Sequence, residues 1–179
     1  MCIRDREAAL VEPAAVGMHA AILGEARLGK SIVILGAGTI GLMVLQACKS
    51  LGATDITVVD VMDKRLDLAK ELGASRTING AKEDTVALLR SEELFGDHGV
   101  ELVFECAGST FTANQAVQIV ARGGKIMMVG TQSKPVPIDF LKINREVTIQ
   151  TSFRYCNNYP QTIEAIRSGK FNVKDMVTH

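Results

Sequence analysis

The sequence has no excess of charge, no closely spaced cysteine pair and no long apolar run, and each absence excludes a class of function. Its 20 basic and 20 acidic side chains give a formal net charge of zero. Proteins that bind nucleic acid or anionic membranes usually carry a basic excess, so neither partner is expected. No apolar run approaches the roughly 20 residues that span a bilayer. Residues 1–6 lead into no hydrophobic segment typical of a signal peptide.

The four cysteines and three histidines are scattered along the chain and form no C-x-x-C pair. Structural zinc sites and dithiol redox sites both use such pairs, so the sequence predicts neither. The helical position of Cys48 favours a small buried core residue. Scattered, reduced thiols are typical of a cytoplasmic protein, and this location is expected here.

The most informative segment is a strand, a glycine-rich turn, a helix and a second strand that ends in an acid. The apolar run 31–35 enters the sequence GAGTIG at residues 36–41, and Asp60 follows the last glycine by 19 residues. In such a G-x-G-x-x-G turn Gly36 permits the tight turn, Gly38 leaves space for a pyrophosphate, and Gly41 lets the helix pack closely. Free N–H groups at the helix start attract the phosphates, and Asp60 would accept hydrogen bonds from the adenosine ribose. The segment predicts dinucleotide binding.

Asp60 also favours NAD over NADP. A carboxylate about 5 Å from a 2′-phosphate meets about 3 kcal/mol of repulsion per phosphate charge at an effective dielectric of 20. Lys64 and Arg65 follow this acid, and basic residues there would neutralise a phosphate. For Lys64 a solvated position on the next helix is the preferred interpretation.

Strands and helices alternate along the chain, as in a parallel sheet covered on both faces. The expected strands are 31–35, 56–60, 76–79, 100–106, 125–129 and 147–153. The expected helices are 40–51, one capped by Asp63 and stopped by Gly73, 85–95, 113–121 and 160–168. Six strands in the order 3-2-1-4-5-6 predict an α/β fold, a doubly wound Rossmann sheet in a single domain. Segments 36–41, 106–108 and 129–131 should surround one crevice, and 136–139 could add a short strand beside the sixth.

Several segments resemble the zinc-dependent medium-chain dehydrogenases. They are ALVEP at 9–13, VGMHA at 16–20, the GAGTIG turn and the helix end AKELGA at 69–74. A narrower resemblance lies in TSFRYCNNYP at 151–160 and NVKDMVTH at 172–179, which are similar to the sorbitol and xylitol dehydrogenase branch. Members of that branch carry an F-R-Y-x-N segment. The resemblance runs from about residue 8 to residue 179.

The resemblance implies an oxidoreductase that oxidises a polyol to a ketone, with NAD as cofactor and zinc in the full-length parent. Glu12 would lie beside the zinc as a tentative ligand, and Arg154 and Tyr155 would reach the polyol hydroxyls. From the residues alone, Glu12 is equally a helix-start carboxylate, Phe153 a core side chain, and Arg154 with Tyr155 a buried hydrogen-bonded pair. The positions expected to hold NAD are Gly36, Gly38, Thr39, Ile40, Gly41, Asp60, Arg65, Cys106, Val129, Gly130, Thr131, Ser152, Phe153 and Arg154.

The sequence departs from this family in lacking the catalytic GroES-like domain that carries the other zinc ligands. We therefore expect a fragment that is inactive alone. Residues 1–6 match no family pattern and are interpreted as a non-native leader, 7–30 as a linking helix region, and 31–179 as the NAD-binding domain. Relatives commonly associate through the cofactor domain, so a homo-oligomer is expected.

Four other interpretations are weighed against a polyol dehydrogenase. A related alcohol, threonine or sugar dehydrogenase would share the cofactor domain, although the 153–157 segment argues against it. Asp60 disfavours a zinc-free quinone reductase that uses NADPH. A methyltransferase has no pyrophosphate to place on the glycine turn. A non-catalytic NAD-sensing domain would need only the crevice.

Overall fold

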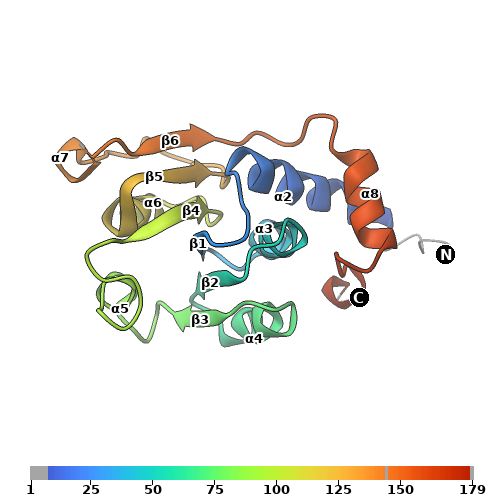
Figure 1. Cartoon of the computed structure of the whole chain (residues 1–179), viewed down its shortest axis with the longest axis horizontal. Helices are drawn as coiled ribbons and strands as arrows, with labels where there is room; N and C mark the ends of the chain where they lie inside the picture. The colour runs from blue at the N-terminus through green and yellow to red at the C-terminus, as the bar shows by residue number, and fades with distance from the viewer. Residues whose placement is uncertain (1–7, 144, 178–179) are drawn as a thin grey trace.

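The computed structural model describes residues 8–143 and 145–177 and shows one six-stranded parallel sheet (Figure 1). The sheet order is β3-β2-β1-β4-β5-β6, with every neighbouring pair parallel. This confirms the predicted doubly wound α/β fold in a single domain. The strands are β1 (Ser31–Leu35), β2 (Asp55–Asp60), β3 (Arg76–Asn79), β4 (Val100–Glu105), β5 (Val120–Met128) and β6 (Thr148–Thr151).

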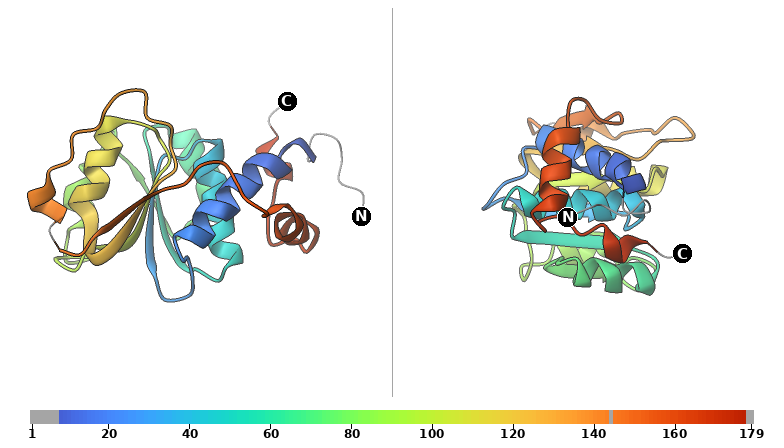
Figure 2. Two further views of the ribbon diagram at one scale, coloured as in Figure 1. Left: turned by 90° about the horizontal axis from the view of Figure 1, so that it is seen from above. Right: turned by 90° about the vertical axis from the view of Figure 1, so that its right-hand side faces the viewer.

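Helices cover both faces of the sheet, so that the molecule has three layers (Figure 2). One face carries α2 (Val11–Leu23), α3 (Thr39–Ser50), α4 (Asp63–Glu71) and α8 (Tyr159–Arg167), and the other carries α5 (Thr85–Leu89), α6 (Thr110–Ile119) and α7 (Phe140–Ile143). A short 3-10 helix, Lys174–Met176, follows α8. Among the helices of the described residues, none is long and apolar enough to cross a membrane.

Alternation along the central strand builds a separate core under each helical layer. Ile32 and Ile34 of β1 pack with α2, α3 and α4, whereas Val33 and Leu35 pack with residues of α5 and α6. All four side chains are completely buried. A strand buried on both faces is apolar throughout, which is why the 31–35 run contains no polar residue after Ser31.

Helix α2 lies tightly against α3 on the first face. A Cβ on Gly17 would lie 2.6 Å from the backbone carbonyl carbon of Met43, so only glycine permits this approach. Ala14, Ala15 and Met18 of the same helix are buried. Residues 11–23 therefore contribute to the core of this domain.

Four local expectations are wrong. Residues 120 and 121 begin β5 and do not end the helix before it, which stops at Ile119. Helix α5 ends at Leu89 and not at residue 95, because the Arg90 guanidinium donates to the Gln118 and Asp97 carbonyls and the chain turns back there. Asp63 is the first residue of α4 and not its cap, since its carboxylate accepts hydrogen bonds from Asn79 and Lys82 instead. Segment 136–139 forms no strand, so β6 has one free edge among the described residues.

Candidate functional site

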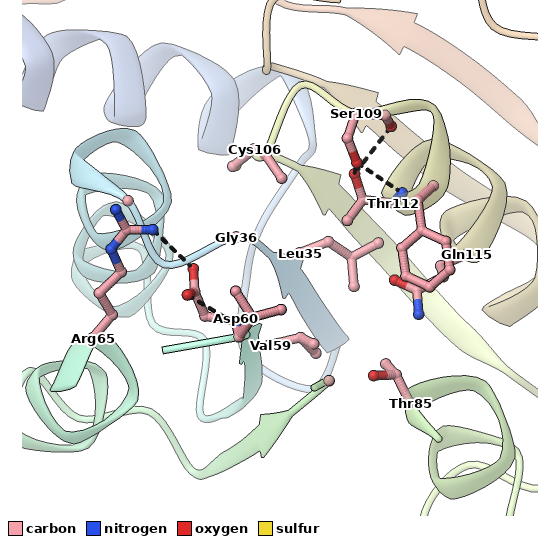
Figure 3. Close-up of a pocket in the computed structure, with 15 residues that line it drawn as sticks. Leu35, Gly36, Val59, Asp60, Arg65, Thr85, Cys106, Ser109, Thr112 and Gln115 are labelled. Atoms are coloured by element: carbon pink, nitrogen blue, oxygen red, sulfur yellow. Dashed lines mark hydrogen bonds and ion pairs between the residues drawn. The ribbon is translucent and has the colours of Figure 1, made fainter. Parts of the chain in front are cut away.

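A pocket of about 380 Å³ opens at the carboxyl ends of β1, β2 and β4, where the strand order reverses (Figure 3). Open α/β sheets bind their ligands at this switch point. On one side the pocket meets the glycine turn and the end of β2, and on the other it meets the start of α6. The lining residues are Leu35, Gly36, Gly38, Val59, Asp60, Val61, Arg65, Gly80, Thr85, Cys106, Ala107, Ser109, Phe111, Thr112 and Gln115.

The three glycines of the turn have different surroundings. Gly36 has a φ of +103°, and a Cβ there would lie 2.9 Å from the Ala107 backbone nitrogen. A Cβ on Gly41 would lie 1.8 Å from the Gly36 carbonyl oxygen, so the helix and the turn approach each other at van der Waals distance. At Gly38 a Cβ would meet nothing within 4 Å. Gly36 and Gly41 therefore serve the fold, while Gly38 faces open space in the site.

Gly38 is the N-cap of α3, and no side chain of the described residues caps this helix start. Thr39 is exposed and Ile40 is half-buried in the first turn. The first N–H groups of a helix have no acceptor within the helix, and they bind anions when nothing else satisfies them. The start of α3 thus leaves backbone N–H groups without a side-chain cap beside Gly38, which lines the pocket.

Asp60 lies at the end of β2 and is 8% exposed. One carboxylate oxygen accepts a hydrogen bond from the Ala37 backbone N–H at 2.7 Å, and the other accepts from Val61 and Met62 at 2.9 and 3.0 Å. The acid therefore holds the glycine turn against β2, a structural role that its spacing in the sequence does not predict. Oδ2, which accepts from only one backbone N–H group, retains a lone pair for a further donor from the pocket.

Arg65, in the first turn of α4, points at Asp60 on the same side of the pocket (Figure 3). Its Nη1 lies 3.6 Å from Asp60 Oδ2, and its side chain is 48% exposed. Lys64 is exposed and does not line the pocket, in agreement with the solvated position expected for it. Arg65 is thus the basic residue next to the acid.

Glu105, the last residue of β4, is a buried carboxylate that our sequence analysis did not single out. It is completely buried, and its Oε1 accepts hydrogen bonds from the backbone N–H groups of Ala107 and Gly108 and from Thr112 Oγ1. Its Oε2 accepts from Gln132 Nε2. The available signal was the same as for Asp60, namely a carboxylate that ends a buried strand at the switch point.

Val129, Gly130 and Thr131 lie beside this network and not in the pocket itself. The backbone N–H groups of Val129 and Gly130 both donate to the Glu105 carbonyl at 2.9 Å. A Cβ on Gly108 would lie 2.7 Å from the Thr131 carbonyl oxygen. The loops after β4 and β5 are therefore packed against each other, and Glu105 joins them.

Cys106 lines the pocket, and burial raises the pKa of its thiol well above the ordinary value. Burial likewise raises the pKa of Cys48, which is completely buried in α3 as expected. Because the thiolate is the reactive form of cysteine, neither residue is a nucleophile near neutral pH. The role of Cys106 is to line the pocket.

The segment after β6 carries the other predicted site residues. Phe153 is 81% exposed, which excludes a core role. The exposed Arg154 has a φ of 53°, and its guanidinium carbon lies 5.4 Å from the Phe153 ring centroid. Arg154 and Tyr155 therefore do not form a buried pair. Ser152 is buried, and its hydroxyl has no hydrogen-bond partner among the described residues.

Tyr155, Tyr159 and Glu12 lie near one another where α8 meets α2. The two tyrosine rings form an edge-to-face pair with centroids 4.8 Å apart. The neighbouring Tyr155 hydroxyl, then burial, and to a smaller degree the charge of Glu12 raise the pKa of Tyr159 to about 12. Tyr159 is therefore protonated at neutral pH.

Glu12 does not by itself make a zinc site. It is an exposed residue in the first turn of α2. Within residues 8–143 and 145–177, no group of three His, Cys, Asp or Glu side chains is placed to hold a metal ion. Because a catalytic zinc takes about three protein ligands, the described residues do not fit one.

Comparison with known proteins agrees with the fold. The chain is 65% identical over 173 residues to an uncharacterized zinc-type alcohol dehydrogenase-like protein, YdjJ, of Escherichia coli, covering 97% of this chain and 49% of the relative. It is 40% identical over 175 residues to a sorbitol dehydrogenase of Bacillus subtilis, covering 96% of this chain and 49% of that protein. The chain thus spans about half the length of these curated relatives.

A solved structure and a family model agree with these relatives. The crystal structure of ECK1772, an Escherichia coli oxidoreductase/dehydrogenase of unknown specificity involved in membrane biogenesis, has a TM-score of 0.94 and 61% identity. The match covers 99% of this chain and 52% of that one. The family model described as zinc-binding dehydrogenase matches residues 39–168. The chain belongs to the zinc-binding dehydrogenase family, whose members include zinc-type alcohol dehydrogenases.

Proposed function

We propose that this chain is the NAD-binding domain of a polyol dehydrogenase of the sorbitol and xylitol type, which oxidises a secondary alcohol to a ketone. The observation that carries the proposal is the pocket at the switch point, because it combines an open Gly38, an uncapped helix start and the Asp60 carboxylate. The polyol part of the proposal is supported by the exposed Phe153-Arg154 pair and by the similarity to a sorbitol dehydrogenase.

Different residues along the crevice would bind different parts of NAD and of the substrate. The start of α3 would hold the pyrophosphate, and Asp60 would accept hydrogen bonds from the adenosine ribose hydroxyls. Bound NAD would supply the hydride acceptor. Cys106, the loop 129–131 and Ser152 would then lie toward the nicotinamide half. Arg154 and Tyr155 would orient the polyol hydroxyls, since Arg154 is exposed and Tyr155 is half-buried in the segment that follows β6.

The proposal also covers the division of the chain, its location and its choice of cofactor. Residues 31–179 would form the NAD-binding unit and 7–30 the link to a catalytic domain, while 1–6 lie outside the described residues. The location would be cytoplasmic, which the three free thiols of the described residues support. NAD would be preferred over NADP because of Asp60, although Arg65 offsets part of the repulsion.

A chimera tests the activity and the role of Arg154 together. We expect a protein that joins this chain to the unmatched half of the Bacillus subtilis sorbitol dehydrogenase to form NADH from sorbitol or xylitol, followed at 340 nm. Arg154→Ala should lower kcat/KM by roughly 10- to 150-fold, since a lost charged hydrogen bond costs about 1.5–3 kcal/mol. The matched control is Arg167→Ala, which removes an exposed arginine that pairs with Glu164 on α8.

The 179-residue chain alone should give no turnover with added zinc, because its described residues bring no three ligands together. A folded chimera that oxidises simple alcohols but no polyol would contradict the polyol assignment. An Arg154→Ala variant with unchanged kcat/KM would remove Arg154 from the substrate site.

The free edge of β6 is the expected interface of a homo-oligomer. Thr148 and Thr151 are exposed, Ile149 is 36% exposed, and α7 lies at the same end of the sheet (Figure 1). Unpaired β-branched edges tend to pair with another chain. Sedimentation velocity should show a dimer that Ile149→Lys converts to monomer. Ile163→Lys, at a similarly exposed position on α8, should leave the dimer intact. A monomer at high micromolar concentration would contradict this interface.

A further inference from the structure

Glu105 is surrounded only by hydrogen-bond donors. Oε1 accepts from Ala107 N at 3.0 Å, Gly108 N at 2.8 Å and Thr112 Oγ1 at 2.7 Å. Oε2 accepts from Gln132 Nε2 at 2.9 Å. Two of these donors are backbone N–H groups, which cannot accept, and an ionised carboxylate can accept all four hydrogen bonds. The contacts of Glu105 suit a carboxylate anion.

No basic side chain neutralises this anion within the described part of the chain. The ion pairs found there all involve other acids. A completely buried carboxylate without a cation is costly, and hydrogen bonds offset only part of that cost. The adjacent start of α6, with its partial positive charge, offsets another part. The fold thus retains a negative charge that it does not pair.

Glu105 ends β4, on the other side of β1 from β2 and Asp60. The Rossmann fold consists of two mononucleotide-binding halves, and Asp60, at the end of β2, belongs to the half that holds adenosine. Glu105 ends β4 in the second half, where it joins the loops after β4 and β5. Its partner Thr112 and its neighbour Cys106 line the pocket. A Cβ on Gly130 would lie 2.9 Å from Glu105 Oε2, so the Gly130 backbone packs closely against the carboxylate.

We propose that Glu105 is a positioning charge beneath the nicotinamide half of the crevice, which favours oxidised NAD⁺ over NADH. The inference rests on the proposed NAD-binding function. With NAD bound, the oxidation would break the alcohol C–H bond and form a C–H bond at nicotinamide C4. The transferred hydride, one proton with two electrons, would cancel the single positive charge of the ring, and the hydroxyl proton would leave to solvent. An unpaired anion attracts the cationic ring and not the neutral one.

The variant Glu105→Gln separates the charge from the hydrogen bonds. Its amide oxygen can replace Oε1 and accept the same three donors. Its amide NH₂ then faces Gln132, whose own amide can rotate to offer oxygen. The network is retained while the charge is removed. The matched control is Glu101→Gln, at the exposed opposite end of β4, where the carboxylate accepts from Ser31 N.

Calorimetric titration of each protein with NAD⁺, NADH and ADP-ribose is the test. We expect Glu105→Gln to raise the ratio Kd(NAD⁺)/Kd(NADH) by about tenfold, which corresponds to about 1.4 kcal/mol. ADP-ribose lacks the nicotinamide ring, so its Kd should not change. Glu101→Gln should leave all three affinities unchanged. A ratio that stays constant in folded Glu105→Gln overturns the proposal, and so does an equal loss of ADP-ribose affinity, which would indicate a merely structural role.

A second variant covers the case in which Glu105→Gln does not fold, as judged by circular dichroism. Gln132→Lys would place an ammonium group beside Oε2 from a half-buried position without altering the carboxylate. It should raise the same ratio in the same direction by about threefold, and an unchanged ratio there overturns the proposal equally. If the wild-type chain binds neither NAD⁺, NADH nor ADP-ribose, the proposed function fails instead.

Discussion

Replacing Gly38 with alanine is expected to leave the fold intact and to weaken NAD binding by at least about 100-fold. The added methyl group would meet nothing within 4 Å, and the φ of −69° suits any residue. The same methyl group would occupy the space in which a pyrophosphate contacts the turn. Loss of two hydrogen bonds between backbone N–H groups and a charged phosphate, at about 1.5–3 kcal/mol each, gives at least this factor. Calorimetric titration with NAD measures the loss of affinity, and thermal unfolding measures whether stability is unchanged.

Gly41→Ala is the matched control, because it should lower stability, whereas Gly38→Ala should not. Its Cβ would lie 1.8 Å from the Gly36 carbonyl oxygen, so the helix or the turn must shift. Overpacking of this kind costs about 1–3 kcal/mol, and a domain of this size loses about 2–4 °C in Tm per kcal/mol. A Gly38→Ala protein that binds NAD like the wild type would show that the turn does not hold a pyrophosphate.

Strands β1 and β2 and the turn between them could be predicted because their signals are local. The apolar runs of β1 and β2, the GAGTIG turn between them and the terminal acid all lie within residues 31–60. The end of α5 could not be predicted, because the Arg90 contacts that stop it reach to Gln118, 28 residues away. The prediction that Asp63 caps α4 was wrong for a similar reason. Asn79 and Lys82 donate hydrogen bonds to the Asp63 carboxylate, which therefore does not cap the helix start.

The candidate site shows the same division between local and distant determinants. The spacing of the glycines and Asp60 predicted a site at the switch point, where the pocket lies. Glu105 was missed because no motif marks it: its near partners Ala107, Gly108 and Thr112 form no distinctive pattern, and Gln132 lies 27 residues away. The second role of Asp60, as acceptor for the Ala37 N–H, was also not visible, since a ribose-binding acid and a turn-holding acid occupy the same position.

That double role determines what Asp60→Ala should do. Loss of a buried carboxylate that accepts three backbone N–H groups is expected to lower stability by about 3 kcal/mol, or about 6–12 °C in Tm. Loss of the hydrogen bonds to the ribose should in addition weaken NAD binding by about 100-fold, while NADP binding changes much less because a repulsive charge disappears with the acid. The gap between the two cofactors should therefore narrow, and calorimetric titration of the folded variant measures it.

Asp63→Ala provides the control, because its exposed carboxylate lies three residues after Asp60 in the chain and accepts hydrogen bonds from Asn79 and Lys82, outside the pocket. It should bind both cofactors like the wild type. Arg65 provides a further test, because its guanidinium group lies 3.6 Å from Asp60. In Asp60→Ala this group would lose its partner and would be free to pair with a 2′-phosphate. The double variant Asp60→Ala with Arg65→Ala should then lose NADP affinity relative to Asp60→Ala alone. Equal affinity of the wild-type chain for NAD and NADP would contradict the role of Asp60 in cofactor choice and leave it as the acid that holds the turn.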